Sequence, residues 1–204
     1  MTSAEELKSL YHPKRILLFC GKRKSGKDFL TDQLQEELSP QNQESPSSSV
    51  IIRLSGPLKK CYADNHGLNY QELLSAGAYK EKHRLNMIKW SEELRNKDYG
   101  YFCRASLKMY QAEKFRTWII SDCRRKTDFK FFEELFPESC RRIRVSASEE
   151  VRKQRGFEHQ PGVDDAESEC GLDDVQDFHY RIANNGDQEA LKLLEEVIKD
   201  VQED

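Results

Sequence analysis

The sequence lacks the features that mark membrane proteins, nucleic-acid-binding proteins and metal or disulfide scaffolds. Its longest apolar run covers only residues 16–20, far short of the ~20 residues that cross a bilayer. It has no excess of one charge, since 33 lysine and arginine residues stand against 36 aspartate and glutamate residues, for a net charge of −3. Such a chain has no overall attraction to nucleic acid or acidic membranes. The six cysteines lie 17 to 42 positions apart with no Cys-x-x-Cys pair, which indicates reduced thiols rather than a zinc cage or a disulfide framework.

Address signals are lacking as well. Residues 1–11 include acidic residues and no apolar core, unlike a signal peptide, and the last residues match no retention or peroxisomal signal. We therefore expect a cytoplasmic (cytosolic) protein with neither membrane nor nucleic acid as a partner. The length of 204 residues, against a usual ~150 per domain, indicates one domain, and we expect a monomer.

Short apolar runs alternate with segments of helical spacing along the chain. Strands are expected at residues 16–20, 50–54, 117–121, 143–145 and 178–182. Helices are expected directly after residue 26, over 56–66, 79–97, 101–111 and 126–136, and at the carboxyl end with one apolar face between 191 and 201. Strands that alternate with helices predict an α/β sandwich on a mostly parallel sheet.

Two segments fit neither pattern. Residues 39–49 are polar, rich in serine and interrupted by proline, and we expect a surface loop there. Residues 156–174 are acidic and contain glycine and proline, a composition that suits a lid. Because carboxylates repel phosphate groups, we expect the acidic residues between 164 and 177 to have a surface or hinge role.

The strongest chemical signal lies between the first expected strand and the first expected helix. It consists of Gly21, Lys22, Arg23, Lys24, Ser25, Gly26, Lys27 and Asp28. In a P-loop of this kind the backbone N–H groups and the helix N-terminus face phosphate groups, and the last lysine reaches the β and γ oxygens. Asp28 stands where the motif has a hydroxyl for Mg²⁺, and its carboxylate could bind the metal directly or through water. A basic surface turn is the alternative for residues 22–24.

Three charged residues follow the expected strand at 117–121. Asp122 resembles the strand-end aspartate that orients magnesium in P-loop enzymes, and a helix cap is its alternative. Arg124 and Arg125 lie at the carboxyl end of the same strand, where ligands bind in open α/β sheets. We expect them near the γ-phosphate, with a surface pair bonded to nearby acids as the alternative.

A cationic stripe is expected on the helix at 79–97. With ~100° per residue, Lys80, Arg84 and Arg95 fall within about 60° of one another. Together with Lys59 they suit an acceptor that already carries negative charge. The other lysines of this helix fit an ordinary solvated face equally well.

These signals together predict a small phosphotransferase with a small anionic acceptor. Arg152 and Arg155 precede the expected lid and could close over a triphosphate. An acceptor phosphate is ionised at neutral pH, so no catalytic base would be needed. A GTPase is disfavoured because the sequence has no Asn-Lys-x-Asp motif. A nucleoside-monophosphate kinase and a nucleic-acid-binding ATPase are the alternatives.

Several strings resemble the animal-type phosphomevalonate kinase family, one of the nucleoside-monophosphate-kinase-like P-loop families. They are residues 18–19 with 21–29, 53–59, 79–81, 102–104, 121–122 with 124–125, and 161–173, within a span of about 15–186. The resemblance implies a P-loop three-layer sandwich, a five-stranded parallel sheet flanked by helices, in a single kinase domain over 1–204. It also implies acceptor-binding helices at about 79–111 and a mobile lid at about 152–174.

The same resemblance implies an activity and roles for individual residues. The activity is Mg²⁺-dependent transfer of the ATP γ-phosphoryl group to (R)-5-phosphomevalonate, in the mevalonate route to isoprenoids and sterols. Catalytic roles are implied for Lys24, Lys27, Arg124 and Arg125. ATP contacts are implied for Gly21, Lys22, Arg23, Lys24, Ser25, Gly26, Lys27, Asp28, Arg144, Arg152, Arg155 and Asn185. Acceptor contacts are implied for Lys59, Lys80, Arg84, Arg95, Arg104, Arg124, Arg125 and Asn184, and metal contacts for Asp28 and Asp122.

Overall fold

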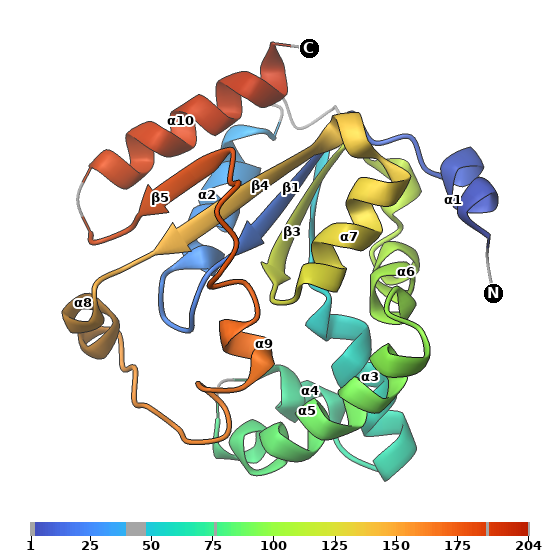
Figure 1. Ribbon diagram of the computed structural model, residues 1–204, viewed down its shortest axis with the longest axis vertical. Helices are drawn as coiled ribbons and strands as arrows, with labels where there is room; N and C mark the ends of the chain where they lie inside the picture. Colours follow the sequence, from blue (N-terminus) through green and yellow to red (C-terminus); the bar gives the residue numbers. More distant parts are fainter. Residues whose placement is uncertain (1–2, 40–47, 76, 187, 204) are drawn as a thin grey trace.

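A five-stranded sheet forms the centre of the computed structural model, which describes residues 3–39, 48–75, 77–186 and 188–203. The strand order is β2-β3-β1-β4-β5 and every neighbouring pair is parallel (Figure 1). The strands are β1 (Arg15–Cys20), β2 (Ser49–Ile52), β3 (Thr117–Cys123), β4 (Cys140–Ser146) and β5 (Tyr180–Ala183). The predicted parallel sheet flanked by helices is confirmed. β4 is longer than the predicted 143–145, because its first residues pair with β1.

Helices connect and cover the strands. They are α1 (Ala4–Leu10), α2 (Lys27–Glu37), α3 (Ser55–His66), α4 (Tyr70–Leu74), α5 (Ala78–Lys97), α6 (Tyr101–Met109), α7 (Lys126–Leu135), α8 (Glu149–Gln154), α9 (Glu167–Cys170) and α10 (Glu189–Gln202). Two short 3-10 turns span Ala112–Lys114 and Pro137–Ser139. In the part of the chain that is described, no helix is long and apolar enough to cross a membrane.

The sequence prediction missed three short helices, α1, α4 and α9. Each is too short for an apolar periodicity to be recognised. α4, for example, is started by the side chain of Asn69, which accepts hydrogen bonds from the backbone N–H groups of Gln71 and Glu72. Of the expected surface loop at 39–49, residues 40–47 lie outside the described ranges and residue 49 begins β2.

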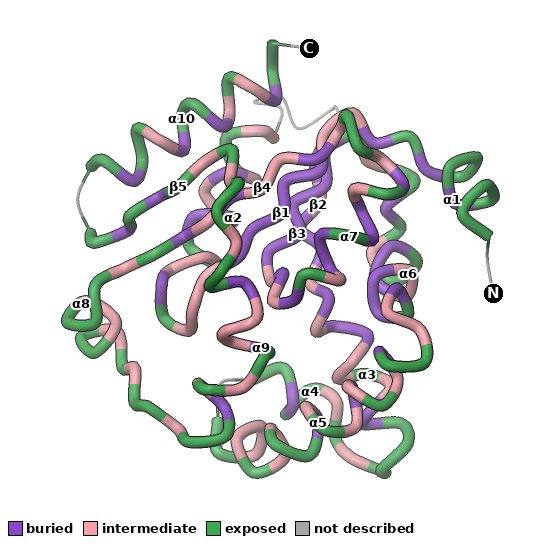
Figure 2. The backbone as a smooth tube through the Cα atoms, in the orientation of Figure 1, coloured by how far each residue is buried: buried purple, intermediate pink, exposed green. Residues whose placement is uncertain are grey.

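Alternate residues of the strands face opposite layers of helices. Leu17 and Phe19 of β1 have no exposed surface and pack in one cluster with α2 and α10. Ile16 and Leu18 are equally buried and pack in the other cluster with α1, α6 and α7. In Figure 2 the central strands are coloured mostly as buried. Because both faces are covered, the strand reads as a continuous apolar run rather than as an alternating one.

The carboxyl ends of β1, β3 and β4 point toward two further groups of helices (Figure 1). On one side, α3, α4 and α5 pack around Tyr62, Leu73 and Met87, a cluster separate from the two that cover the sheet. On the other side, α8 and α9 follow β4. Open parallel sheets bind ligands at this edge, so the cationic residues predicted from the sequence belong to elements that meet there.

Leu18 tests the position of β1 at the centre of the core. We expect Leu18→Ala to lower the free energy of unfolding by about 2–5 kcal/mol, because buried methyl groups are lost and a cavity remains. Chemical denaturation measures this change. The control is Leu191→Ala on α10, where the residue is 40% exposed, and its cost should stay below about 1 kcal/mol. Equal losses in the two variants would contradict the central position of β1.

Candidate active site

Residues 21–26 connect β1 to α2, and residues 27 and 28 begin α2, so the motif at 21–28 lies in the context that a P-loop requires. Gly21 has φ +148°, and a Cβ on it would lie 2.1 Å from the carbonyl oxygen of Val145. Gly26 has φ +87°, and its Cβ would lie 2.2 Å from Nδ2 of Asn184. Both positions therefore need glycine, for the left-handed backbone and for the close approach. The free N–H groups at the start of α2 follow directly, and they attract anions.

Lys27, the first residue of α2, points back into the loop. Its Nζ donates hydrogen bonds to the carbonyl oxygens of Gly21, at 2.5 Å, and of Lys22, at 3.1 Å. Burial, and after it the positive charge of Arg124, lower the pKa of Lys27 to about 7. A phosphate beside Nζ would favour the charged amine and reverse this shift.

Residues far away in the sequence hold the carbonyl groups of the loop. Nε of Arg152 donates to the oxygen of Arg23 at 2.8 Å, and Nη1 of Arg155 donates to the oxygen of Ser25 at 3.2 Å. Nδ2 of Asn184 donates to the same Ser25 oxygen at 3.2 Å. Arg152 and Arg155 thus lie at the loop, and so does Asn184, which the sequence analysis assigned to the acceptor.

Two other residues assigned to ATP lie beside the loop without such a contact. Oδ1 of Asn185 accepts a hydrogen bond from the backbone N–H of Ser148 at 2.9 Å, at the start of α8. Arg144 on β4 forms an ion pair with Asp173 at 2.7 Å. The side chain of Asn185 thus bonds to the start of α8, and that of Arg144 bonds to the acidic segment before β5.

A cavity of about 250 Å³ lies at the helix end of the loop and is lined by Lys24, Gly26, Lys27, Asp28 and Arg155. The side chain of Asp28 is 79% exposed, and its carboxylate lies 3.8 Å from Arg53. The described residues contain no cluster of three metal-ligating side chains. Mg²⁺ in phosphate-transferring sites is bound by one or two carboxylates together with phosphate oxygens, so an accessible carboxylate beside the P-loop fits such an ion.

A second cavity, of about 110 Å³, lies between α3, α5, the end of β3 and the segment around α9. Its wall combines apolar side chains with six cations. The apolar residues are Leu54, Leu58, Met87, Ile88 and Val163. The cations are Lys59, Lys80, Arg84, Arg95, Arg124 and Arg125. The structure therefore brings together the stripe on α5, the lysine on α3 and the two strand-end arginines.

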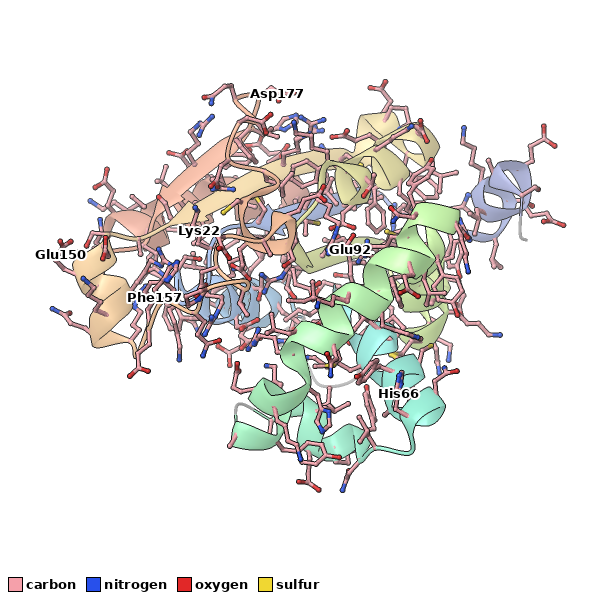
Figure 3. All side chains as sticks on the ribbon, turned by 60° about the horizontal axis from the view of Figure 1, so that its bottom comes forward. Lys22, His66, Glu92, Glu150, Phe157 and Asp177 are labelled. Carbon is pink, nitrogen blue, oxygen red and sulfur yellow. The ribbon has the colours of Figure 1, made fainter. Side chains whose placement is uncertain are left out.

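The four arginines of this cavity each have a carboxylate partner. The pairs are Arg84 with Glu81, Arg95 with Asp128, Arg124 with Glu169, and Arg125 with Glu92. Glu92 can be found on α5 in Figure 3, on the side of the helix toward the sheet. Three of these acids lie 33 or 45 positions from their arginine partners, so no local sequence pattern indicates the pairs and only folding brings them together.

Lys59 and Lys80 differ from the arginines because their side-chain ammonium groups have no hydrogen bond or ion pair with any described residue. Burial, and then the charge of Lys80, lower the pKa of Lys59 to about 8. Burial, and then the charge of Arg84, lower the pKa of Lys80. The wall also includes Asp122, Asp128 and Glu169, but the ammonium groups of Lys59 and Lys80 form an ion pair with none of them.

Two residues expected at the site have other partners. Arg104 on α6 pairs with Asp98 and lies over the ring of Phe131, and it is among the lining residues of neither cavity. Asp122 lines the smaller cavity, but its two carboxylate oxygens accept hydrogen bonds from the N–H groups of Leu54, at 2.6 Å, and Ser55, at 3.0 Å. Asp122 therefore caps α3, which precedes it in the sequence.

The acidic segment before β5 contacts the P-loop, so the expected surface role is wrong for Asp164 and Glu169. Asp164 pairs with Arg23 at 3.0 Å, and its side chain is only 6% exposed. Glu169 accepts a hydrogen bond from the backbone N–H of Arg23 at 3.1 Å and is 4% exposed. Asp173 pairs with Lys22 at 2.6 Å; Lys22 is labelled in Figure 3. No local pattern could reveal these contacts, which join residues more than 140 positions apart.

A solved structure shares the overall fold. TT1252 from Thermus thermophilus matches 94% of this chain and 97% of its own, with a TM-score of 0.52 and 16% identity. A shikimate kinase from Bacteroides thetaiotaomicron matches 93% of this chain and 98% of its own, with a TM-score of 0.42 and 12% identity. At such identities the first likeness concerns the fold alone.

Sequence comparison is more specific than the fold. A phosphomevalonate kinase from Drosophila melanogaster is 41% identical over 185 residues, which make up 88% of this chain and 94% of that protein. A family model described as phosphomevalonate kinase matches residues 19–138, a span that includes the P-loop, α5 and the arginines after β3. The motif that binds phosphates and the cations beside it thus lie within the matched region, and the chain belongs to the phosphomevalonate kinase family of ATP-dependent kinases.

Proposed function

We propose that the chain transfers the γ-phosphoryl group of ATP to (R)-5-phosphomevalonate and releases (R)-5-diphosphomevalonate and ADP. In this reaction an oxygen of the acceptor phosphate bonds to the γ-phosphorus while the bond from phosphorus to the bridging oxygen of ADP breaks. The description of the family and the name of the Drosophila protein support this acceptor. The chemistry of the smaller cavity supports it independently.

The observation that carries the proposal is that Lys59 and Lys80, two half-buried cations on the cavity wall, have no ion-pair partner among the described residues. Buried charges without partners are unfavourable, so a ligand with negative charge is the natural complement of this cavity. Leu58 and Met87 offer contact to an aliphatic chain. Among the described residues that line the cavity there is no aromatic ring. A nucleobase would find no aromatic stacking partner, which favours phosphomevalonate over a nucleoside monophosphate.

Catalysis at this site requires no general base. The acceptor phosphate is largely ionised at neutral pH, so positioning and neutralisation of charge must supply the rate. We assign catalytic roles to Lys24 and Lys27 in the P-loop and to Arg124 and Arg125 at the end of β3. The guanidinium groups would stabilise charge on the transferred group, and Arg124 would exchange Glu169 for phosphate oxygens.

We place ATP along residues 21–28, with Arg144, Arg152, Arg155 and Asn185 on the same side. Asn184, which binds the loop, belongs with them rather than with the acceptor. Asp28 would hold Mg²⁺, and the ion would neutralise charge on the β and γ oxygens. Asp122 would be the second carboxylate, through the lone pairs that its hydrogen bonds with the N–H groups of Leu54 and Ser55 leave unused. The acceptor contacts are Lys59, Lys80, Arg84, Arg95, Arg124 and Arg125; we leave out Arg104.

We further propose a single domain, with α5 and α6 in the acceptor region at 79–111 and a lid at 152–174. Arg152 and Arg155 donate hydrogen bonds to carbonyl oxygens of the P-loop, which supports a lid on the nucleotide side. We also propose that the enzyme is a cytosolic monomer.

A substrate panel tests the reaction. ADP formation is followed with MgATP and either 5-phosphomevalonate, mevalonate, AMP, CMP or UMP at matched concentrations. We expect turnover with 5-phosphomevalonate alone, because only this compound joins a phosphate to an anionic aliphatic chain. Turnover with a nucleotide and none with 5-phosphomevalonate would keep the fold and reject the acceptor.

Lys27 should take up a proton when MgATP binds. Its pKa of about 7 in the free protein leaves it mostly neutral at pH 8, and phosphate contact stabilises the charged amine. Calorimetric titrations at pH 8, in two buffers with different protonation enthalpies, should show uptake of nearly one proton. Lys27→Met should abolish most of this uptake, whereas Lys192→Met, an exposed lysine on α10, should leave it unchanged. Equal uptake by wild type and Lys27→Met would contradict the role of Lys27.

Arg124 should act on the chemical step more than on ATP binding. We expect Arg124→Ala to lower kcat about 100-fold and to change the KM for MgATP less than about threefold, because its charge is needed most in the transition state. Steady-state kinetics measure both constants. Arg141→Ala, which removes a half-buried arginine paired with Asp200, is the matched control. A loss confined to ATP affinity would move Arg124 to the donor site.

A further inference from the structure

A single buried carboxylate connects the acceptor helix to the end of β3. Asp128 lies in the first turn of α7 and is 1% exposed. Its Oδ1 accepts a hydrogen bond from Nη1 of Arg95 on α5 at 2.8 Å. Its Oδ2 accepts from the backbone N–H groups of Arg124, at 2.9 Å, and Arg125, at 3.0 Å. Both oxygens are therefore engaged, by one side chain and by two consecutive peptide groups.

The three arginines that contact Asp128 all line the smaller cavity. From the fixed peptide groups, the side chains of Arg124 and Arg125 diverge. The first pairs with Glu169 on α9 and the second with Glu92 on α5. Arg95, Arg124 and Arg125 thus share one anchor while each reaches a different part of the wall. A shift of that anchor would move all three guanidinium groups at once.

Two of these guanidinium groups keep an unused donor. The Nε atoms of Arg95 and Arg125 are buried and have no hydrogen-bond partner among the described residues. The two residues are 7% and 6% exposed. Buried donors are normally satisfied, so these groups have hydrogen-bonding capacity that the described part of the protein does not use.

We propose that Asp128 is a positioning residue for the acceptor half of the site. It does not act on the substrate; it fixes Arg95 and the backbone of Arg124 and Arg125, and these arginines meet the bound acceptor. This inference rests on the proposed function. Misplacement of a catalytic group by about 1 Å can cost on the order of 100-fold in rate, so the anchor should affect acceptor turnover strongly and ATP binding little.

Asp128→Asn tests the proposal with little change in size. The amide nitrogen cannot accept a hydrogen bond, so either Arg95 or the two backbone N–H groups lose their acceptor. We expect kcat/KM for 5-phosphomevalonate to fall at least about tenfold and the KM for MgATP to stay within about twofold. The matched control is Asp98→Asn. Asp98 also bridges a backbone N–H, that of Gly100, and an arginine, Arg104, but lines neither cavity, and its kinetic constants should stay within about twofold.

The outcomes separate positioning from a purely structural role. An active, folded Asp128→Asn with unchanged acceptor kinetics would overturn the proposal, as would equal losses for both substrates or an equal loss in Asp98→Asn. Wild-type turnover of 5-phosphomevalonate is measured first, since its absence rejects the proposed function rather than this inference.

A second pair of variants applies if Asp128→Asn does not fold because Arg95 is left buried without its partner. Asp128→Asn combined with Arg95→Met removes both buried charges and is compared with Arg95→Met alone. We expect the double variant to have the lower kcat with 5-phosphomevalonate, because Arg124 and Arg125 have lost the charged acceptor of their N–H groups. Equal kcat in the two variants would overturn the proposal.

Discussion

Repulsion among the cations at one edge of the sheet is the constraint on which the rest of the site depends. Parallel strands bring the P-loop, the start of α7 and the cationic face of α5 to the same edge, and six positive side chains border one cavity of about 110 Å³. Buried charges of one sign are tolerated only when they are paired or lose their charge. The protein uses both solutions, pairing for the arginines and a lowered pKa for the lysines.

The pairing partners come from three different elements. Glu92 belongs to α5, Asp128 to α7 and Glu169 to α9. The first two lie on helices that pack on the core, so Arg95 and Arg125 are held in fixed positions. Glu169 lies in the segment between β4 and β5, where Asp164 and Asp173 also neutralise cations of the P-loop. Phosphate groups would use those same cations, so nucleotide binding and the placement of this segment are electrostatically linked.

The sequence predicted the elements whose signals are local. The apolar run at 16–20 lies within one strand, and the glycines and lysine after it lie within one loop. The spacing of Lys80, Arg84 and Arg95 lies within one helix. It could not predict contacts that depend on how distant elements pack. Arg104 is an example. Arg104 and Arg84 are both arginines, but the break between α5 and α6 directs Arg104 to Asp98, whereas Arg84 lines the cavity. The expected surface role is wrong for Asp164 and Glu169, because the attraction of these acids to the P-loop residue Arg23 and to Arg124 depends on how distant elements pack.

The lysines show how the site can be strongly cationic toward a ligand and still fold. Burial lowers the pKa of Lys27 to about 7 and that of Lys59 to about 8. Near neutral pH, Lys27 is therefore only partly protonated in the free protein, and Lys59 begins to lose its proton just above that pH. This reduces the repulsion from Arg124 and Lys80. When phosphate oxygens enter, the charged amines are favoured again, and the positive charge is then largest where the transferred group carries its negative charge. Arginines cannot respond in this way, because they keep their proton at any physiological pH, so the four arginines of the smaller cavity need the fixed carboxylate partners that Lys59 and Lys80 do without.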